Sequence, residues 1–269
     1  DKYCFTLDKI RVKDIDPMYI YAMLYIFVPN FEEELCTGSS YPTFNIKQLE
    51  NYLIPIPKNK QKMIEWSDKI SEPYNEKLTK ENRIKELEKE LQERVKFISE
   101  NEDCEEKTIG ELFTLKNGAQ LDTKNIVTGL YPVYGGGRDI IKYHNKYNRE
   151  NCIIIAGTGN YCGNVSININ KIWASQAFTI ESKNDSKTLY NYYYYFYFKN
   201  YDLFTIKSIG SAQKFIRPSQ FEKSNIKIPK NKQLITDIEP QFQELEQLYV
   251  DVKNADKKYK DLIEELRNE

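Results

Sequence analysis

The sequence predicts an α+β protein in which globular domains alternate with two long helices that pair as an antiparallel coiled coil. Three observations predict this fold: an internal repeat, two charged stretches with heptad-spaced apolar residues, and a block of short Ile/Val runs separated by Gly/Asn turns. The predicted segments are residues 1–61, the C-terminal part of a first globular domain; 62–103, a first spacer helix; 104–230, a second globular domain; and 231–269, a second spacer helix.

The internal repeat has a constant offset. IPIPKNKQ at Ile54–Gln61 returns 172 residues later as IKIPKNKQ at Ile226–Gln233, and residues 38–61 and 210–233 share 11 of 24 positions without a gap. Further upstream, PMYIYAMLY falls against LYNYYYYFY, and CFTL falls against AFTI. A repeat at fixed offset marks repeated architecture. No counterpart of YPVYGGGRD or AGTGNYCGN precedes Cys4, so we expect the first domain to lack its N-terminal half.

Both spacer stretches carry apolar residues at helical spacing. In the second stretch, a seam of about five heptads is typical of a coiled coil. Its two core positions hold Ile235, Phe242, Tyr249 and Ile263, and Ile238, Leu245, Val252, Tyr259 and Leu266, with Asp256 as the one break. The first stretch has a seam that Pro73 interrupts, formed by Met63, Trp66 and Ile70 and then by Ile84, Leu87, Leu91 and Ile98. Since neither helix can bury its apolar stripe alone, we expect the two to pair in antiparallel fashion.

The second domain has the pattern of strands and tight loops. NCIIIAGTGNYCGNVSININKIWASQAFTIES alternates short Ile/Val-rich runs with Gly/Asn turns. YPVYGGGRDI predicts a glycine-rich loop beside a Tyr/Val strand, and LYNYYYYFYFKN predicts a buried helix. The single histidine, His144, lies in a Lys/Asn/Tyr-rich stretch, and we expect it to be an exposed loop residue.

The formal net charge of −1 hides an uneven distribution. Residues 108–230 carry 16 Lys/Arg and 8 Asp/Glu, a net of +8, whereas residues 62–107 and 231–269 each carry a net of −4. A basic block of this size is typical of a protein that binds an anionic polymer such as nucleic acid. The simpler interpretation is that the lysines only keep the domain in solution.

Composition excludes several other classes. No apolar run approaches the roughly 20 residues of a membrane span, and the chain does not open with a signal peptide. The five cysteines, Cys4, Cys36, Cys104, Cys152 and Cys162, show no CxxC spacing. An odd, scattered set fits a reducing compartment, so we expect a cytoplasmic protein without a disulfide framework or a metal site.

The order of these motifs resembles the DNA-specificity (S) subunit of type I restriction–modification systems. The motifs are YPVYGGGRDIIKYHNKYN, IIIAGTGNYCGNV, WASQAFTI and GSAQKFIRPSQFEKSNIKIPKNKQ, followed by a coiled-coil helix. The resemblance implies two target-recognition domains, each for one half of a bipartite double-stranded DNA site. It also implies two spacer helices that dock methyltransferase (M) subunits, with a restriction (R) subunit as a further partner. It implies no catalytic activity in this chain and no cofactor.

The candidate DNA-binding residues lie in small-residue loops, where backbone amides can approach phosphates closely. Asn amides can pair with adenine, and Arg with phosphate or guanine. Each residue alone would also suit a turn, a cap or a solvated charge; together, on a basic domain, they indicate DNA. The set comprises Gly135, Gly136, Gly137, Arg138, Lys142, Thr158, Asn160, Tyr161, Asn164, Ser211, Gln213, Lys214 and Arg217, with Ser39, Ser40 and Tyr41 in the first copy.

Three rival interpretations differ from this one. A methyltransferase is disfavoured because no acidic residue precedes the glycines of IIIAGTGNYCG, because NVSINI after them predicts a strand, and because no Asn/Asp-Pro-Pro-aromatic motif occurs. A C-terminal specificity region of a fused restriction–methyltransferase enzyme stays open. A coiled-coil assembly protein that binds no DNA also stays open, although the +8 block counts against it.

Overall fold

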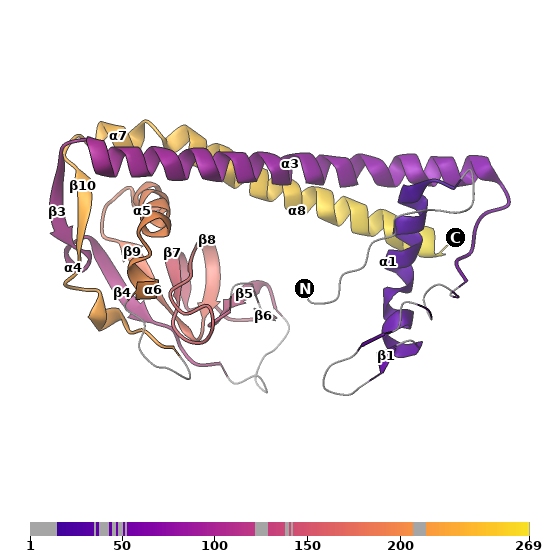
Figure 1. The fold of residues 1–269 in the computed structure, drawn as a ribbon, viewed down its shortest axis with the longest axis horizontal. Helices are drawn as coiled ribbons and strands as arrows, with labels where there is room; N and C mark the ends of the chain where they lie inside the picture. Colours follow the sequence, from indigo (N-terminus) through magenta and orange to yellow (C-terminus); the bar gives the residue numbers. More distant parts are fainter. Residues whose placement is uncertain are drawn as a thin grey trace. The chain divides into compact units, whose positions relative to one another are not determined.

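The chain forms two compact units, which are described separately. The computed structural model describes residues 15–34, 36–37, 43–44, 47, 51, 53–121, 129–137, 140, 142–206 and 214–268. Unit 1 comprises Asp1–Ile84 and Gln247–Glu269, and unit 2 comprises Lys85–Glu246. The division passes through both long helices, α3 (Lys60–Asn101) and α8 (Glu239–Asn268) (Figure 1). The boundaries of the four segments expected from the sequence stay predictions.

Unit 2 is built on a six-stranded sheet with the strand order β4-β9-β7-β8-β5-β6. In chain order the strands are β4 (Phe113–Asn117), β5 (Tyr131–Tyr134), β6 (Lys142–His144), β7 (Arg149–Ala156), β8 (Val165–Ala174) and β9 (Ala177–Ser182). Neighbouring strands run antiparallel, except for the parallel pair β5 and β8. The predicted mixture of Ile/Val-rich strands and tight turns is therefore confirmed.

The aromatic segment forms the predicted buried helix, α5 (Lys187–Tyr201), which packs against β7, β8 and β9. All residues from Leu189 to Phe198 are buried, as expected for a helix that is apolar on every side. Three rings, Phe178, Phe204 and Phe221, pack together beneath it, with centroid distances of 4.7–6.0 Å. The sheet and α5 thus share one aromatic core.

The opposite side of α5 faces the part of the long helices that belongs to unit 2 (Figure 1). Tyr192 and Phe196 stack on Phe242 of α8, at centroid distances of 5.2 and 6.0 Å. The side-chain amide of Asn200 donates to the carbonyl oxygen of Gln92 on α3 at 3.0 Å. The domain is therefore fixed to the beginning of α8 and to the end of α3.

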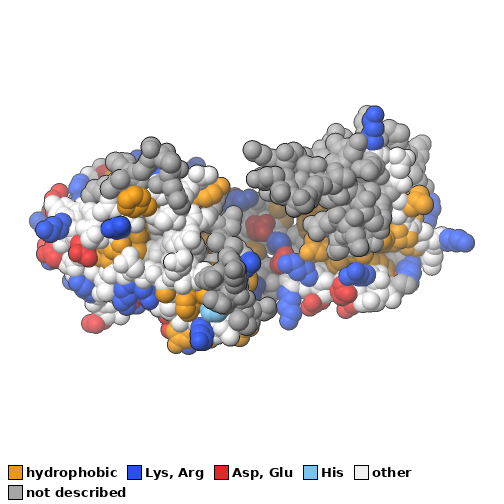
Figure 2. All heavy atoms as spheres, turned by 90° about the horizontal axis from the view of Figure 1, so that it is seen from below, with side chains coloured by type: hydrophobic (Ala, Val, Ile, Leu, Met, Phe, Trp, Pro, Cys, Tyr) orange, Lys and Arg blue, Asp and Glu red, His pale blue; other side chains and the backbone are white. Residues whose placement is uncertain are grey.

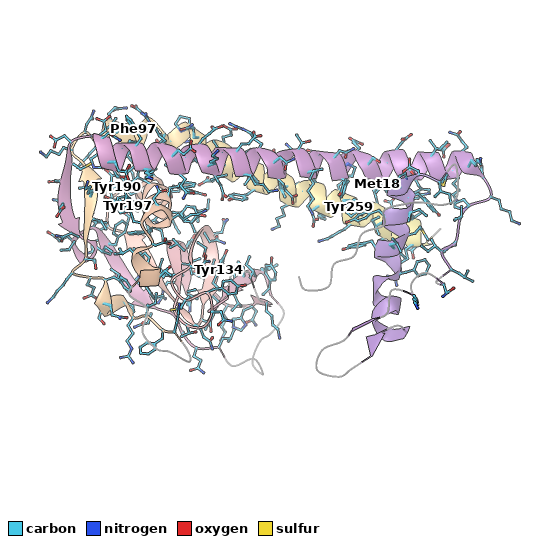
Figure 3. All side chains as sticks on the ribbon, in the orientation of Figure 1. Met18, Phe97, Tyr134, Tyr190, Tyr197 and Tyr259 are labelled. Carbon is cyan, nitrogen blue, oxygen red and sulfur yellow. The ribbon has the colours of Figure 1, made fainter. Side chains whose placement is uncertain are left out.

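The predicted joint between domain and helix is a short strand. β10 (Asn225–Pro229) pairs antiparallel with β3 (Cys104–Thr108), the strand that follows α3. The backbone N–H of Lys227 donates to the hydroxyl of Tyr197 at 3.2 Å, which ties β10 to α5 (Figure 3). The remaining short helices of unit 2 are α4 (Ile109–Leu112), α6 (Leu203–Ile206), the 3-10 turn η2 (Pro218–Gln220) and α7 (Gln233–Thr236).

Unit 1 packs α1 (Pro17–Glu34) against α3 and α8. Its short strands β1 (Cys36–Thr37) and β2 (Thr43–Phe44) form an antiparallel pair. Figure 3 shows Tyr259 of α8 among the side chains where these helices meet. The core of unit 1 consists of Tyr19, Ala22, Met23, Ile26, Met63, Trp66, Ile70, Tyr259, Ile263 and Leu266.

The antiparallel pairing of the long helices is confirmed by ion pairs within unit 1. Glu72 pairs with Lys258 at 3.2 Å, Lys77 with Asp256 at 2.5 Å, and Lys80 with Asp251 at 2.7 Å. Residue numbers rise along α3 as they fall along α8, which is the antiparallel sense. Asp256, the break in the predicted apolar seam, is therefore used for an ion pair with the facing helix.

The predicted heptad seam is wrong at Tyr249, which is 44% exposed. A straight α-helix drifts by about 20° per heptad relative to a strict seven-residue repeat, so one apolar stripe cannot face a partner along the whole helix. Ala255, outside the predicted seam, is buried instead. Pro73 interrupts the seam of α3 but does not end the helix, which continues to Asn101.

The expectation for His144 is also wrong. His144 is the last residue of β6 and is only 6% exposed. Its imidazole meets the indole of Trp173 edge to face, with ring centroids 5.0 Å apart. A polar neighbourhood in the sequence concealed an edge strand whose alternate side chain points into the domain.

The two repeat copies differ where the proline linker meets its helix. Ile228 lies on β10, which pairs with β3, and is 5% exposed, whereas its counterpart Ile56 is 46% exposed. A cavity of about 500 Å³ lies beside Ile56, lined by α1, the linker and both long helices of unit 1. Among the described residues, the segment 53–57 pairs with no strand.

Candidate nucleic-acid interface

Three segments that are far apart in the sequence meet at one end of the sheet of unit 2. The first is the glycine loop after β5, the second is the turn after β7, and the third is the extended segment before η2. Gly136 lies so close to Thr158 that a Cβ on Gly136 would stand 2.6 Å from the carbonyl oxygen of Thr158. Only glycine allows this approach of the first two segments.

The turn after β7 is a tight structure that exposes two side chains. Gly159 and Gly163 have φ angles of +84° and +92°, a conformation that favours glycine. The N–H of Cys162 donates to the carbonyl oxygen of Gly159 at 3.1 Å, which closes the turn. Between the glycines, Asn160 is exposed and Tyr161 is 50% exposed. The loop thus offers an amide and a phenol ring from a rigid backbone.

The third segment is joined to this turn as a short extended strand. The N–H of Gly159 donates to the carbonyl oxygen of Lys214 at 3.0 Å, and that of Ile216 donates to Gly157 at 2.9 Å. Thr158 and Phe215 form the antiparallel bridge between these two bonds. The backbone hydrogen bonds place Lys214 beside the turn that carries Asn160.

Other predicted residues lie at the edges of this arrangement. Gly135 and Gly137 flank Gly136 in the loop, and Asn164 closes the turn by donating its N–H to the carbonyl oxygen of Tyr161 at 2.9 Å. Lys142 is exposed on β6, the edge strand, opposite Val133 of β5. Lys142 therefore lies on β6, outside the three segments that meet.

Six predicted residues lie outside the described residues. They are Arg138, Ser211 and Gln213 in the second copy, and Ser39, Ser40 and Tyr41 in the first. Their roles stay predictions.

Positive charge without a local acidic partner marks the meeting point. Among the described residues, neither Lys214 nor Arg217 forms an ion pair with a carboxylate. Burial raises the pKa of the Cys162 thiol, and the positive charge of Lys214 opposes this shift, which indicates that Lys214 lies near the turn. Figure 2 shows lysine and arginine side chains on the underside of unit 2, together with a smaller number of aspartate and glutamate side chains.

Phe215 is not among the residues predicted from the sequence, although its ring lies between Lys214 and Arg217 in the third segment. It is 36% exposed, and the guanidinium carbon of Arg217 lies 5.6 Å from its ring centroid. The signal was present in KFIRP, where outward and inward residues alternate as in a strand. This extended segment is too short for its alternation to be distinguished in the sequence.

The described residues contain no group of three or more His, Cys, Asp or Glu side chains arranged to hold a metal ion. Cys104, Cys152 and Cys162 are free thiols. Nor does any helix of the described part have the length and apolarity needed to cross a bilayer.

A basic α+β domain whose loops converge on one exposed surface, joined to paired helices, is typical of modules that recognise DNA. Residues 101–249, more than half of the chain, match the family described as the type I restriction modification DNA specificity domain. The chain belongs to this family, which confirms the resemblance that the sequence suggested. Proteins of the family supply DNA-sequence recognition in type I restriction–modification systems and are generally non-catalytic.

One solved structure supports the fold, and a second shows a weaker similarity. The S subunit of a type I restriction–modification system from M. genitalium is similar over 93% of this chain and 72% of its own, at 18% identity and a TM-score of 0.60. The HsdS subunit from Thermoanaerobacter tengcongensis covers 93% of this chain and 69% of its own, at 11% identity and a TM-score of 0.39. No curated protein matches the sequence significantly.

Proposed function

We propose that this chain recognises a bipartite double-stranded DNA site and positions methyltransferase and restriction subunits on it without catalysing a reaction itself. Residues 104–230 act as a target-recognition domain for one half of the site. Residues 1–61 contribute to the reader of the other half, and the paired helices set the distance between them. Membership of the DNA specificity family supports recognition; the repeated architecture supports two half-sites.

The observation that carries the proposal is the convergence of three separate loop segments into one surface. The glycine loop follows β5, the Asn160 turn follows β7 and Lys214 precedes η2, so it is the fold of unit 2 that brings these segments together. This surface combines close backbone approach, an exposed amide and cations without acidic partners in the described part of unit 2. Those are the groups that bind phosphates and base edges.

The residues divide into two roles. Lys142, Lys214 and Arg217 supply phosphate contacts, which provide affinity and fix the register on the duplex. Asn160 supplies an amide for a base edge, with adenine as its usual partner. Arg138, Ser211 and Gln213 lie outside the described residues, and their contacts with DNA stay predictions.

A salt titration of duplex binding tests the proposal. Each phosphate contact contributes about one to the slope of log affinity against log salt concentration. We expect Lys214→Ala to weaken binding to all duplexes alike and to lower the slope by about one. Lys89→Ala is the matched control, since Lys89 is an exposed lysine of unit 2 on α3, outside the proposed surface.

The outcomes separate the proposal from a helical assembly protein. Duplex binding with a steep salt slope that Lys214→Ala lowers and Lys89→Ala leaves unchanged supports a reader of DNA. Absence of duplex binding by the full chain at low salt would contradict it. Equal salt slopes for Lys214→Ala and Lys89→Ala would show that Lys214 makes no phosphate contact.

A further inference from the structure

Phe215 is held in a fixed position on the surface proposed to bind DNA. In the extended segment Lys214–Arg217, Ile216 is 5% exposed and its side chain points into the domain. Because side chains alternate along extended backbone, Phe215 points outward. The bridge to Thr158 and the flanking hydrogen bonds to Gly157 and Gly159 fix this orientation.

Arg217 restricts the ring further. Its guanidinium carbon lies 5.6 Å from the ring centroid of Phe215, within the range of a cation–π contact. The backbone N–H of Arg217 donates to the side-chain oxygen of Gln220, and Pro218 follows as a buried residue. The ring and the guanidinium therefore form one pre-ordered pair, which loses little conformational freedom on binding.

The degree of exposure distinguishes between two uses of such a ring. A side chain that wedges between base pairs must project far enough to enter the stack. Phe215 is only 36% exposed, so it offers a flat apolar patch rather than a projecting wedge. A flat apolar patch on a basic surface suits the one apolar group in the major groove, the C5-methyl of thymine.

We infer that Phe215 contacts the methyl group of a thymine in the half-site recognised by unit 2, and so determines specificity at that base pair. The inference rests on the proposed function, because it needs the surface to lie in the major groove. It adds a second aromatic ring to a site that otherwise offers backbone, polar and charged groups and the phenol ring of Tyr161.

The test begins with the full chain and a random duplex library, from which the preferred duplex is selected. Each thymine of that duplex is then replaced in turn by deoxyuridine, which lacks only the methyl group. We expect one position at which replacement weakens wild-type binding about fourfold, the value of one buried CH₂-sized group. A scan without any sensitive thymine would overturn the inference.

Variants at Phe215 assign the contact. Phe215→Ala should bind the thymine duplex and the duplex with deoxyuridine at the sensitive position equally well. Phe215→Leu, which keeps a smaller apolar side chain, should show an intermediate ratio of the two affinities. Phe97→Ala is the matched control, because Phe97 is a 49% exposed phenylalanine on α3 of the same unit (Figure 3). It should retain the full wild-type ratio. Phe215→Leu decides the question if Phe215→Ala fails to fold.

Failure of the inference differs from failure of the proposed function. Selective, salt-dependent binding with a thymine ratio that the Phe215 variants leave unchanged overturns the role of Phe215 alone. Selection of no preferred duplex overturns both.

Discussion

Leu245 offers the sharpest test of how the long helices are packed, because the sequence assigned it to the same seam as Tyr249. The structure separates the two residues: Leu245 is 1% exposed and Tyr249 is 44% exposed. A strict heptad seam would make both positions equally sensitive to a charge. The exposures in this structure make only Leu245 sensitive.

The expected magnitude for Leu245→Asp follows from its burial. Truncation of a fully buried leucine costs about 2–5 kcal/mol, and a carboxylate left without a partner in the core adds to this. The sum is at least about 4 kcal/mol, which lowers the unfolding midpoint by roughly 10 °C or more for a domain of this size. Tyr249→Asp should change stability by about 1 kcal/mol or less, as is usual for exposed positions.

Thermal unfolding followed by far-UV circular dichroism measures both variants under the same conditions. Leu245→Ala is a further variant, for which the loss should stay within the range for cavity formation. Similar midpoints for Leu245→Asp and Tyr249→Asp would refute the packing described here.

Three further predictions concern charge, the glycine loop and helix length. Hydrogen bonds from Lys260 and, to a smaller extent, from Lys77 lower the pKa of Asp256 below its ordinary value of 3.8. These bonds therefore stabilise the folded protein fully above about pH 3.8, and the stabilisation is lost as the pH falls through the lowered pKa. Asp256→Asn should therefore flatten the acid limb of thermal stability between about pH 2 and 5, by less than about 1 kcal/mol; an unchanged limb would contradict this. Gly136→Ala should push the loop away from Thr158 and reduce selective more than non-selective duplex binding, with unchanged selectivity as the contrary result. Insertion of one heptad in both α3 and α8 lengthens the spacer by about 10 Å, which is about three base pairs at 3.4 Å per pair. With a partner methyltransferase and a DNA library of variable gap length, methylation should therefore prefer a gap about three base pairs longer. A preferred gap that does not change with helix length would refute the spacer role.

The sequence predicted those features that depend on local pattern or on the repeat. Strands β7, β8 and β9 follow from short apolar runs between turns, the buried helix α5 from an unbroken aromatic run, and the antiparallel spacer from apolar residues at helical spacing. The proline linker predicted the joint between domain and helix. These features depend on residue type at short range, so a single sequence contains enough information to find them.

What escaped prediction depends on tertiary contact. His144 packs against Trp173, a residue on another strand, and the exposure of Tyr249 reflects the drift of an α-helix relative to a strict heptad repeat. The role of Phe215 as a bridge partner of Thr158 depends on two segments that are 57 residues apart in numbering. The loops were predicted one by one as candidates, but their convergence appears only when the sheet order is known.

Asn160 tests the central proposal, base recognition by the converged loops, most directly. The measurement compares the affinity of wild type and Asn160→Ala for the selected duplex and for scrambled duplexes at one salt concentration. If Asn160 makes a bidentate base contact, the variant should lose about 1–3 kcal/mol on the selected duplex and almost nothing on the scrambled ones. An equal loss on both kinds of duplex would contradict base recognition by this loop.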